Sequence, residues 1–128
     1  MPIKYLLDAS ALLALLRVER GADVVEKLFQ ECAINSANLT EVFTKLIQLG
    51  WTPDSVREHV AQLKIPVLPV TQAEADASAN LAPLAWQKGI SLGDRLCLAT
   101  CITHNLIALT TESRWPDNAG VSIQRIRY

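Results

Sequence analysis

The stretch LLDASALLALL at residues 6–16 sets the opening of the fold, because one acidic residue separates an apolar run from a helical pattern. Residues 3–7 form a short run, interrupted by polar Lys4, that predicts a buried strand ending at Asp8. Ser10 is then expected to cap a helix that carries leucines at positions 12, 13, 15 and 16. The stretch therefore predicts a strand that leads into a helix through a carboxylate.

The same alternation continues to the end of the chain. Helices are expected over residues 22–31 and from Ala37 or Asn38 to Gly50, and two more are expected to begin at Pro53 and after Ser91. A long helix is expected from Thr71 to near Gly89, with Thr71 and Glu74 forming a capping box at its start. Strands are expected over residues 32–36, 64–70, 106–109 and 121–126. Two prolines favour an edge position for the 64–70 strand, and Pro83 is expected to kink or end part of its helix. Strands that alternate with helices predict an α/β fold with a parallel sheet covered on both faces.

Length and composition limit the function classes. A chain of 128 residues without linkers or repeats is expected to form a single domain over residues 1–128. Half of the residues are hydrophobic and 20% are charged, which excludes a mainly disordered chain. The net charge of −1 excludes a strongly basic surface overall. The candidates for a local basic rim are Arg17, Arg20, Arg125 and Arg127.

The apolar segments are too short for a membrane span. The longest near the start, residues 6–16, contains Asp8 and Ser10 and falls below the roughly 18 apolar residues that a span needs. The N-terminus also lacks the layout of a cleaved signal. We therefore expect a cytoplasmic protein that does not contact a membrane.

The cysteines favour a reducing environment. Three cysteines are an odd number without the spacing of a disulfide scaffold. Cys97, Cys101 and His104 follow one another at spacings of four and three on one expected helix, and such a spacing is compatible with a zinc site. No further soft ligand is well placed, so buried cysteines on an inward helix face are the favoured interpretation.

Acidic residues stand at corresponding points of the alternating pattern. Asp8 ends the first strand, Glu41 lies in NLTEV at residues 38–42, and Asp94 lies in SLGDRLCLAT at residues 91–100. The carboxyl ends of parallel strands and the N-termini of the following helices share one edge of a sheet. We therefore expect these acids to converge there, together with Glu112 after the strand 106–109.

Clustered carboxylates predict a site for a divalent cation. They repel one another, and their burial is unfavourable unless a cation or protons compensate. Mg²⁺ or Mn²⁺ suits such a set, since both prefer oxygen ligands, and both support hydrolysis of a phosphodiester. Each acid also has a structural alternative, because carboxylates near helix N-termini are favoured by the helix dipole and by capping, as for Asp94 after Ser91.

The sequence resembles the PIN-domain family, and in size and motif set the VapC-type toxin ribonucleases. The resemblance rests on LLDASALLALL at residues 6–16, NLTEV at 38–42, SLGDRLCLAT at 91–100 and LTTESRW at 109–115. It implies a three-layer α/β/α sandwich around a mostly parallel sheet of about five strands. It also implies metal-dependent endonucleolytic cleavage of RNA.

The resemblance assigns Asp8, Glu41 and Asp94 to the three best-kept acids of the family. The fourth family position usually carries aspartate in the pattern T-x-D-x-x-[FW]. Thr110 and Trp115 match that frame, but a glutamate, Glu112, stands at the acidic position. All four acids are expected to be catalytic and to hold the metal, and Asp117 is the alternative to Glu112.

Neighbouring polar residues are candidates for supporting roles. Ser10 either caps its helix or holds a metal-bound water or a phosphate. Thr40 and Thr110 are more often caps than ligands, and Thr110 or Thr111 is a candidate to orient an acid or a water molecule. Arg95 and Arg114 either contact a substrate phosphate or form ordinary salt bridges.

The resemblance also implies partners. A small antitoxin is expected to dock a tail or helix over the acidic groove and to place an arginine among the carboxylates. A homodimer is expected, with the helices around residues 42–63 as its interface. Three alternatives remain: a PIN-like binding module without activity, a housekeeping PIN nuclease without an antitoxin, and a phosphotransfer receiver or phosphatase. Against the phosphotransfer receiver or phosphatase, this sequence has no second aspartate two residues after Asp8 and no lysine after the strand 106–109.

Overall fold

The computed structural model describes residues 2–117 and 119–127, which form a five-stranded parallel sheet. The strands are β1 (Tyr5–Leu7), β2 (Cys32–Asn35), β3 (Val67–Leu68), β4 (Ile107–Thr110) and β5 (Ile123–Arg125). Their order is β3-β2-β1-β4-β5, and the observed pairs are all parallel. The predicted edge position of the proline-flanked strand is confirmed, since β3 is outermost. The first strand, β1, is central and pairs Leu6 with Ala33 on one side and with Ala108 on the other.

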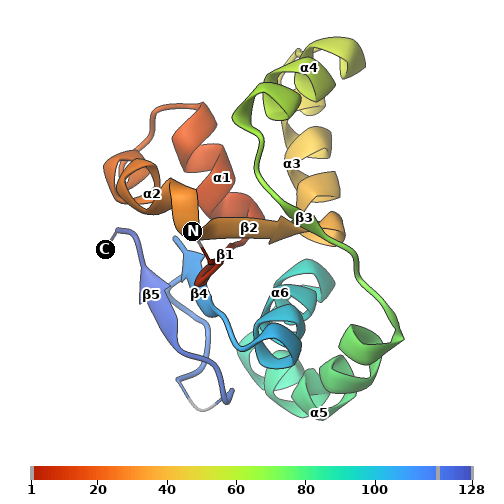
Figure 1. Cartoon of the computed structure of the whole chain (residues 1–128). Coiled ribbons are helices and arrows are strands. Elements are labelled where there is room, and N and C mark those ends of the chain that lie inside the picture. Colours follow the sequence, from red (N-terminus) through yellow and green to blue (C-terminus); the bar gives the residue numbers. More distant parts are fainter. Residues whose placement is uncertain (1, 118, 128) are drawn as a thin grey trace.

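Helices cover both faces of the sheet (Figure 1). They are α1 (Ala9–Leu16), α2 (Ala22–Leu28), the 3-10 turn η1 (Phe29–Glu31), α3 (Ser36–Gln48), α4 (Pro53–Leu63), α5 (Gln72–Lys88) and α6 (Leu92–His104). Alternate strand residues supply two buried clusters. Leu7, Ile34 and Leu109 pack with α1 to α4, and Leu6, Ala33 and Ala108 pack with α5 and α6. The predicted three-layer α/β/α arrangement is therefore confirmed.

Two helix starts differ from the sequence prediction. The cap of α1 is Asp8 and not Ser10, because the Asp8 carboxylate accepts a hydrogen bond from the Ala11 N–H. The third helix, α3, begins at Ser36 and is capped by Asn35, one to two residues before the predicted start. In both places the last strand residue or the one after it caps the next helix, so the chain turns from strand to helix without a loop.

The prediction that Pro83 would end part of its helix is wrong. The fifth helix, α5, runs from Gln72 to Lys88 without interruption. Pro83 is exposed, so the carbonyl left without an N–H partner faces water, and the packing of α5 against α6 holds the helix together. The Thr71–Glu74 capping box, by contrast, is confirmed.

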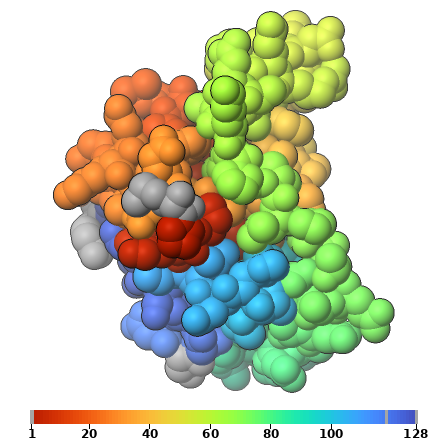
Figure 2. Space-filling view, in the orientation of Figure 1, coloured from red at the N-terminus to blue at the C-terminus, as the bar shows by residue number. Residues whose placement is uncertain are grey.

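The end of α3 and the whole of α4 project beyond the sheet. In the space-filling view they form the yellow-green arm that stands out from the rest of the surface (Figure 2). Within the described residues, no helix is long and apolar enough to span a membrane.

The carboxyl ends of β1, β2 and β4 lie at one edge of the sheet, and the N-termini of α1, α3 and α6 gather around this edge.

Candidate functional site

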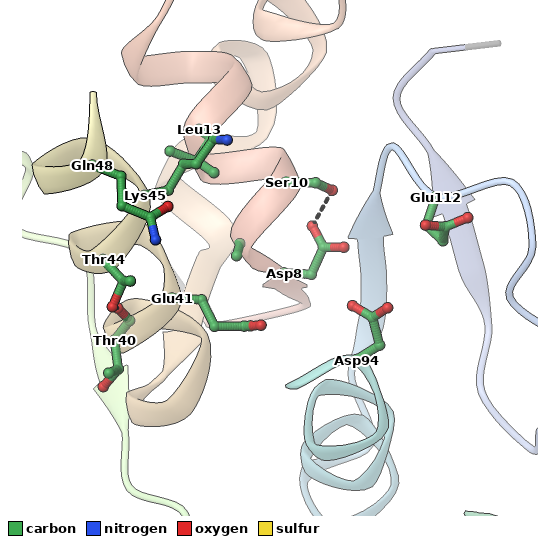
Figure 3. A pocket seen from close by; sticks show the side chains of 11 residues that line it. Asp8, Ser10, Leu13, Thr40, Glu41, Thr44, Lys45, Gln48, Asp94 and Glu112 are labelled. Carbon is green, nitrogen blue, oxygen red and sulfur yellow. Dashed lines mark hydrogen bonds between the residues drawn. The ribbon is translucent and has the colours of Figure 1, made fainter. Parts of the chain in front are cut away.

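A cavity of about 480 Å³ lies at this edge. Its lining includes all four predicted acids: Asp8, Glu41, Asp94 and Glu112. Their side chains come from the end of β1, from α3, from α6 and from the loop after β4, and those of Asp8, Glu41 and Asp94 extend toward a common space (Figure 3). The alternative residue, Asp117, is not part of the lining; its side chain is 93% exposed and lies 3.7 Å from Arg125.

Asp8 is the most deeply placed of the four. It follows the central strand, and only 2% of the residue is exposed. Its carboxylate accepts hydrogen bonds from the Ser10 hydroxyl (2.7 Å), the Thr110 hydroxyl (2.5 Å) and the Ala11 N–H (2.8 Å). Burial nevertheless raises the pKa of Asp8 to about 6, and the nearby charge of Asp94 adds to the rise.

Glu41 is held from two sides. The amide of Asn38, one helical turn earlier and fully buried, donates a 2.7 Å hydrogen bond to the Glu41 carboxylate. The same amide donates to the Gly93 carbonyl at 3.1 Å and so ties α3 to the first turn of α6. A Cβ atom at position 93 would overlap the Glu41 carboxylate, so only glycine leaves room for it.

Asp94 lies in the first turn of α6, whose cap Ser91 accepts a hydrogen bond from the Asp94 N–H. The predicted cap is therefore confirmed, and it leaves the Asp94 carboxylate free to face the cavity. Burial raises the pKa of Asp94; the charge of Glu112 adds to the rise, whereas Arg114 opposes it.

Glu112 differs from the other three because it has a cationic partner. Arg114 donates from Nε to Oε1 at 3.0 Å and from Nη2 to Oε2 at 3.4 Å, and its backbone N–H also reaches Oε1 at 3.0 Å. These contacts lower the pKa of Glu112. Among the described residues, Asp8, Glu41 and Asp94 form no salt bridge with a lysine, arginine or histidine.

The hydroxyls of Ser10 and Thr110 serve Asp8 and the adjoining loop together. Besides donating to Asp8, Ser10 accepts the Thr111 N–H at 3.0 Å, and Thr110 accepts the Glu112 N–H at 2.9 Å. The expected role of Thr110 in orienting an acid is what the structure shows. Ser10 has the same role in place of the capping role predicted for it.

A polar wall on α3 was not predicted as a whole. Thr40, Thr44, Lys45 and Gln48 line the cavity beside Glu41. Thr40 was a candidate, but the other three were missed, although their spacings of three, four and seven residues from Glu41 place them on one helix face. The Lys45 ammonium group makes no salt bridge within the described part of the chain.

Other candidates lie away from the cavity. Cys97 and Cys101 are buried free thiols, while His104 approaches Glu74 at 3.9 Å. The favoured interpretation of the cysteines as core residues is therefore confirmed. Arg95 does not line the acidic cavity; it faces a small apolar void next to Leu98, and its buried Nε has no hydrogen-bond partner among the described residues.

The donor set suits a hard divalent cation. Four carboxylates and one lysine line the cavity, and burial raises the pKa of the deepest carboxylate, Asp8. Oxygen ligands of this kind fit Mg²⁺ or Mn²⁺. In the described residues the acids face one cavity but do not converge on one point, since no three histidine, cysteine or acidic side chains are grouped closely enough to hold a metal ion.

Comparisons with known proteins agree with this architecture. The family model described as PIN domain matches residues 5–121. The fold is similar to that of DNA-bound VapBC from Salmonella typhimurium, with a TM-score of 0.76 and 14% identity over 97% of this chain and 98% of that chain. It is also similar to FitAcB from Neisseria gonorrhoeae, with a TM-score of 0.75 and 20% identity over 95% and 97% of the two chains.

A third similar structure is VapBC-5 from Mycobacterium tuberculosis, a member of the VapBC family of toxin-antitoxin systems. Its TM-score is 0.61 at 19% identity, over 99% of this chain and 100% of that chain. No curated protein matches the sequence. At these identities the structural likeness establishes the fold.

Proposed function

The chain belongs to the PIN-domain family, and from this premise we propose that it is a divalent-metal-dependent endoribonuclease and the toxin of a type II toxin–antitoxin pair. The observation that carries the proposal is the buried carboxylate of Asp8, which shares one cavity with three further acids and makes no salt bridge within the described residues. A protein gains no stability from such an arrangement, so a functional ligand accounts for it better than folding does.

Asp8, Glu41 and Asp94 are the side chains that would hold the ion. A bound Mg²⁺ or Mn²⁺ supplies a water nucleophile at neutral pH and neutralises charge on a phosphate. Glu112, the fourth predicted acid, faces the same cavity, but its carboxylate oxygens accept hydrogen bonds from Arg114. It reaches an ion only by giving up part of that pair.

The surrounding residues keep the acids in place. Ser10 and Thr110 each donate a hydroxyl hydrogen bond to Asp8, which fixes both of its oxygens. Asn38 fixes Glu41, and the tight contact with Gly93 limits the space into which that carboxylate can turn. Preorganised groups of this kind lower the reorganisation needed when charge develops at a reacting phosphate.

The cavity also offers contacts for a phosphodiester chain. The hydroxyls of Thr40 and Thr44, the amide of Gln48 and the ammonium group of Lys45 form one wall. Hydroxyl, amide and cationic side chains are the usual donors to phosphate and sugar oxygens. This wall supports a nucleic-acid substrate, and the family resemblance selects RNA.

Cleavage of a fluorophore-labelled single-stranded RNA tests the activity. We expect cleavage with Mg²⁺ or Mn²⁺, none with excess chelator, and none by the Asp8→Asn or Asp94→Asn variants. Each variant should keep the circular dichroism spectrum of the wild type. RNA binding without cleavage under any divalent ion would instead identify an inactive binding module, and cleavage at the normal rate by either variant would overturn the site assignment.

The partner proposal rests on the acidic cavity and on the solved relatives. The similar structures include complexes described as VapBC and FitAcB. A cavity rich in carboxylates complements an antitoxin arginine, which would exclude metal and substrate. We also propose a homodimer through the helices α3 and α4. Growth arrest on expression, relieved by a short reading frame next to the gene, tests the toxin role, and light scattering at micromolar concentration tests the dimer.

A further inference from the structure

The loop between β4 and β5 carries an ion pair, and a contribution to folding stability does not by itself explain why the pair lies there. Arg114 and Glu112 are two residues apart, and their side chains are 66% and 26% exposed. Exposed pairs of this kind contribute little to stability. The pair nevertheless involves three donors of Arg114, namely its backbone N–H, Nε and Nη2. This geometry fixes the direction of the guanidinium group.

The loop itself is anchored from β5. The Arg125 guanidinium donates hydrogen bonds to the backbone carbonyls of Glu112 (3.3 Å), Ser113 (3.5 Å) and Trp115 (2.9 Å). On the other side, the Glu112 N–H donates to the Thr110 hydroxyl, which in turn donates to Asp8. The position of Arg114 is therefore connected to the centre of the acidic cavity through a continuous set of hydrogen bonds.

Arg114 adjoins the cavity through Glu112. Glu112 lines the cavity and pairs with Arg114, and the charge of Arg114 acts on Asp94. Figure 3 shows Glu112 across the site from Thr44, Lys45 and Gln48. Cations thus lie on both sides of the carboxylates: Lys45 on the α3 wall and Arg114 on the loop.

A guanidinium group has five N–H donors, and the pair with Glu112 involves only one from Nε and one from Nη2. Within the described residues, the remaining hydrogens on Nη1 and Nη2 make no hydrogen bond, and the side chain is 66% exposed. Arginine donors in this fork arrangement suit two oxygens of one phosphate group.

We propose that Arg114 is a phosphate-binding residue for the RNA substrate and that Glu112 is the positioning residue that holds it. This assignment rests on the proposed function. It also accounts for the glutamate at a position where the resembled pattern has aspartate. The longer side chain turns back far enough to accept both the backbone N–H and Nε of Arg114. The ion is then left to Asp8, Glu41 and Asp94.

Binding of a fluorescein-labelled single-stranded RNA, measured by anisotropy in chelator, tests the proposal without cleavage. We expect Arg114→Gln to raise the Kd about tenfold and to lower the slope of log Kd against log salt concentration by about 0.7, the value for one phosphate contact on a single strand. Arg114→Lys should recover only part of the affinity, because it keeps the charge and loses the fork.

Arg57→Gln is the matched control. Arg57 is an arginine of similar exposure (63%) that also pairs with an acid nearby in sequence, Asp54, but it lies on α4 and does not line the cavity. Its replacement should leave the Kd within about twofold of the wild type. If Arg114→Gln and Arg57→Gln bind RNA equally well, the proposal is overturned.

The positioning role of Glu112 has its own readouts. Glu112→Gln should raise the Kd less than Arg114→Gln, and the double variant should bind no more weakly than Arg114→Gln alone, because the two residues act as one unit. Mn²⁺ affinity, measured by calorimetry, should be unchanged in Glu112→Gln and lowered in Asp94→Asn. Additive losses of RNA affinity, or a loss of Mn²⁺ affinity in Glu112→Gln, would overturn the positioning role.

The outcome also separates this proposal from the proposed function. Metal-dependent cleavage of RNA by the wild type, together with unaltered binding by Arg114→Gln, leaves the nuclease standing and removes Arg114 from it. A wild-type protein that neither binds nor cleaves RNA overturns both.

Discussion

Two buried carboxylates, Asp8 and Glu74, occupy similar positions in different parts of the molecule. Each residue is 2% exposed, and each takes part in capping the N-terminus of a helix: Asp8 is the N-cap of α1, and Glu74 completes the capping box that Thr71 begins at α5. Each also accepts hydrogen bonds from two threonine or serine hydroxyls. Burial and hydrogen-bond number alone would therefore predict the same behaviour for both.

Their pKa values move in opposite directions. Burial raises the pKa of Asp8 to about 6 against the lowering effect of its hydrogen bonds. Burial also acts on Glu74, but hydrogen bonds from Thr103 and Thr71 outweigh it and lower the pKa of Glu74 to about 2. Asp8 follows the central strand between both helix layers and has Asp94 as a neighbour, whereas Glu74 lies in an outer helix with His104 at 3.9 Å.

The difference distinguishes a structural acid from a candidate functional one. The chain supplies Glu74 with the donors that its charge needs, and this contact joins α5 to the last turn of α6. At the opposite end of α6, Asp8 and Asp94 make no salt bridge within the described residues. An uncompensated charge at such a depth indicates a place for an external cation.

The largest expected effect separates the two acids by activity. Asp8→Asn should lower RNA cleavage by about 1,000-fold, equivalent to about 4 kcal/mol, because it removes a metal-binding charge from the site. Glu74→Gln should cleave at close to the wild-type rate, since Glu74 contacts the far end of α6. Initial rates with saturating Mn²⁺ measure both, and equal losses in the two variants would remove the functional distinction.

The next effect is the pH dependence of stability in chelator. An unfolded aspartate titrates near 3.8 and Asp8 in the folded protein near 6, so the folded state binds the extra proton between these values. Its burial penalty is complete above pH 6 and disappears below pH 3.8. Relative to Asp8→Asn, the wild type should therefore gain up to about 3 kcal/mol as the pH falls from 7 to 4.

Urea unfolding of both proteins at several pH values measures this difference. Asparagine at position 8 does not titrate, so contributions from the other acids cancel in the comparison. Adding Mn²⁺ at pH 7 should stabilise the wild type and leave Asp8→Asn nearly unchanged. A wild type that loses stability relative to the variant on acidification would show that the Asp8 charge is already compensated.

A smaller effect is expected when the structural acid is neutralised. Glu74→Gln should lower the free energy of unfolding at pH 7 by about 1–3 kcal/mol, because the hydrogen bonds from Thr71 and Thr103 lose their charged acceptor. The loss should shrink as the pH falls from 4.5 toward 2, where Glu74 itself becomes protonated. Chemical denaturation at pH 7 and pH 3 measures it, and an unchanged stability at pH 7 would contradict the structural role.

The smallest effect concerns the support of Glu41. Gly93→Ala places a Cβ against the Glu41 carboxylate, which should turn aside and lower cleavage about tenfold. Alanine favours a helix over glycine by about 1 kcal/mol, so the variant should unfold no more easily than the wild type. Activity that falls while the melting temperature holds or rises is the expected result. Full activity would show that Glu41 adapts without loss.

Local patterns predicted most of the fold. The apolar run before Asp8 and the capping box at Thr71 depend on neighbours within a few residues, and both appear as expected. The prolines around Val67 and Leu68 likewise predicted an edge strand. Pro83 did not end α5, because the packing of α5 on α6, which joins residues far apart in sequence, overrides a local preference.

That the four acids line one cavity was also predictable, since parallel strands bring their carboxyl ends to one edge. Their roles as ligands stay a prediction. The contacts that hold those acids from another element were missed. Asn38, on the same helix as Glu41, also donates a hydrogen bond to the Gly93 carbonyl 55 positions later, and no local pattern indicates that contact.

The sequence by itself determined the alternation of strands and helices and placed Asp8 after a strand and Asp94 in a first helical turn, because hydrophobic period and capping act over one or two turns. Glu41 lies one turn further along its helix, since α3 begins at Ser36. Only the tertiary structure decided which acids acquire partners. Glu74 meets Thr103, and Glu112 turns to Arg114, while Asp8 lies at the centre of the sheet with Asp94 for a neighbour. The charge on a side chain is a local property, but its compensation depends on what folding brings within a few ångströms of it.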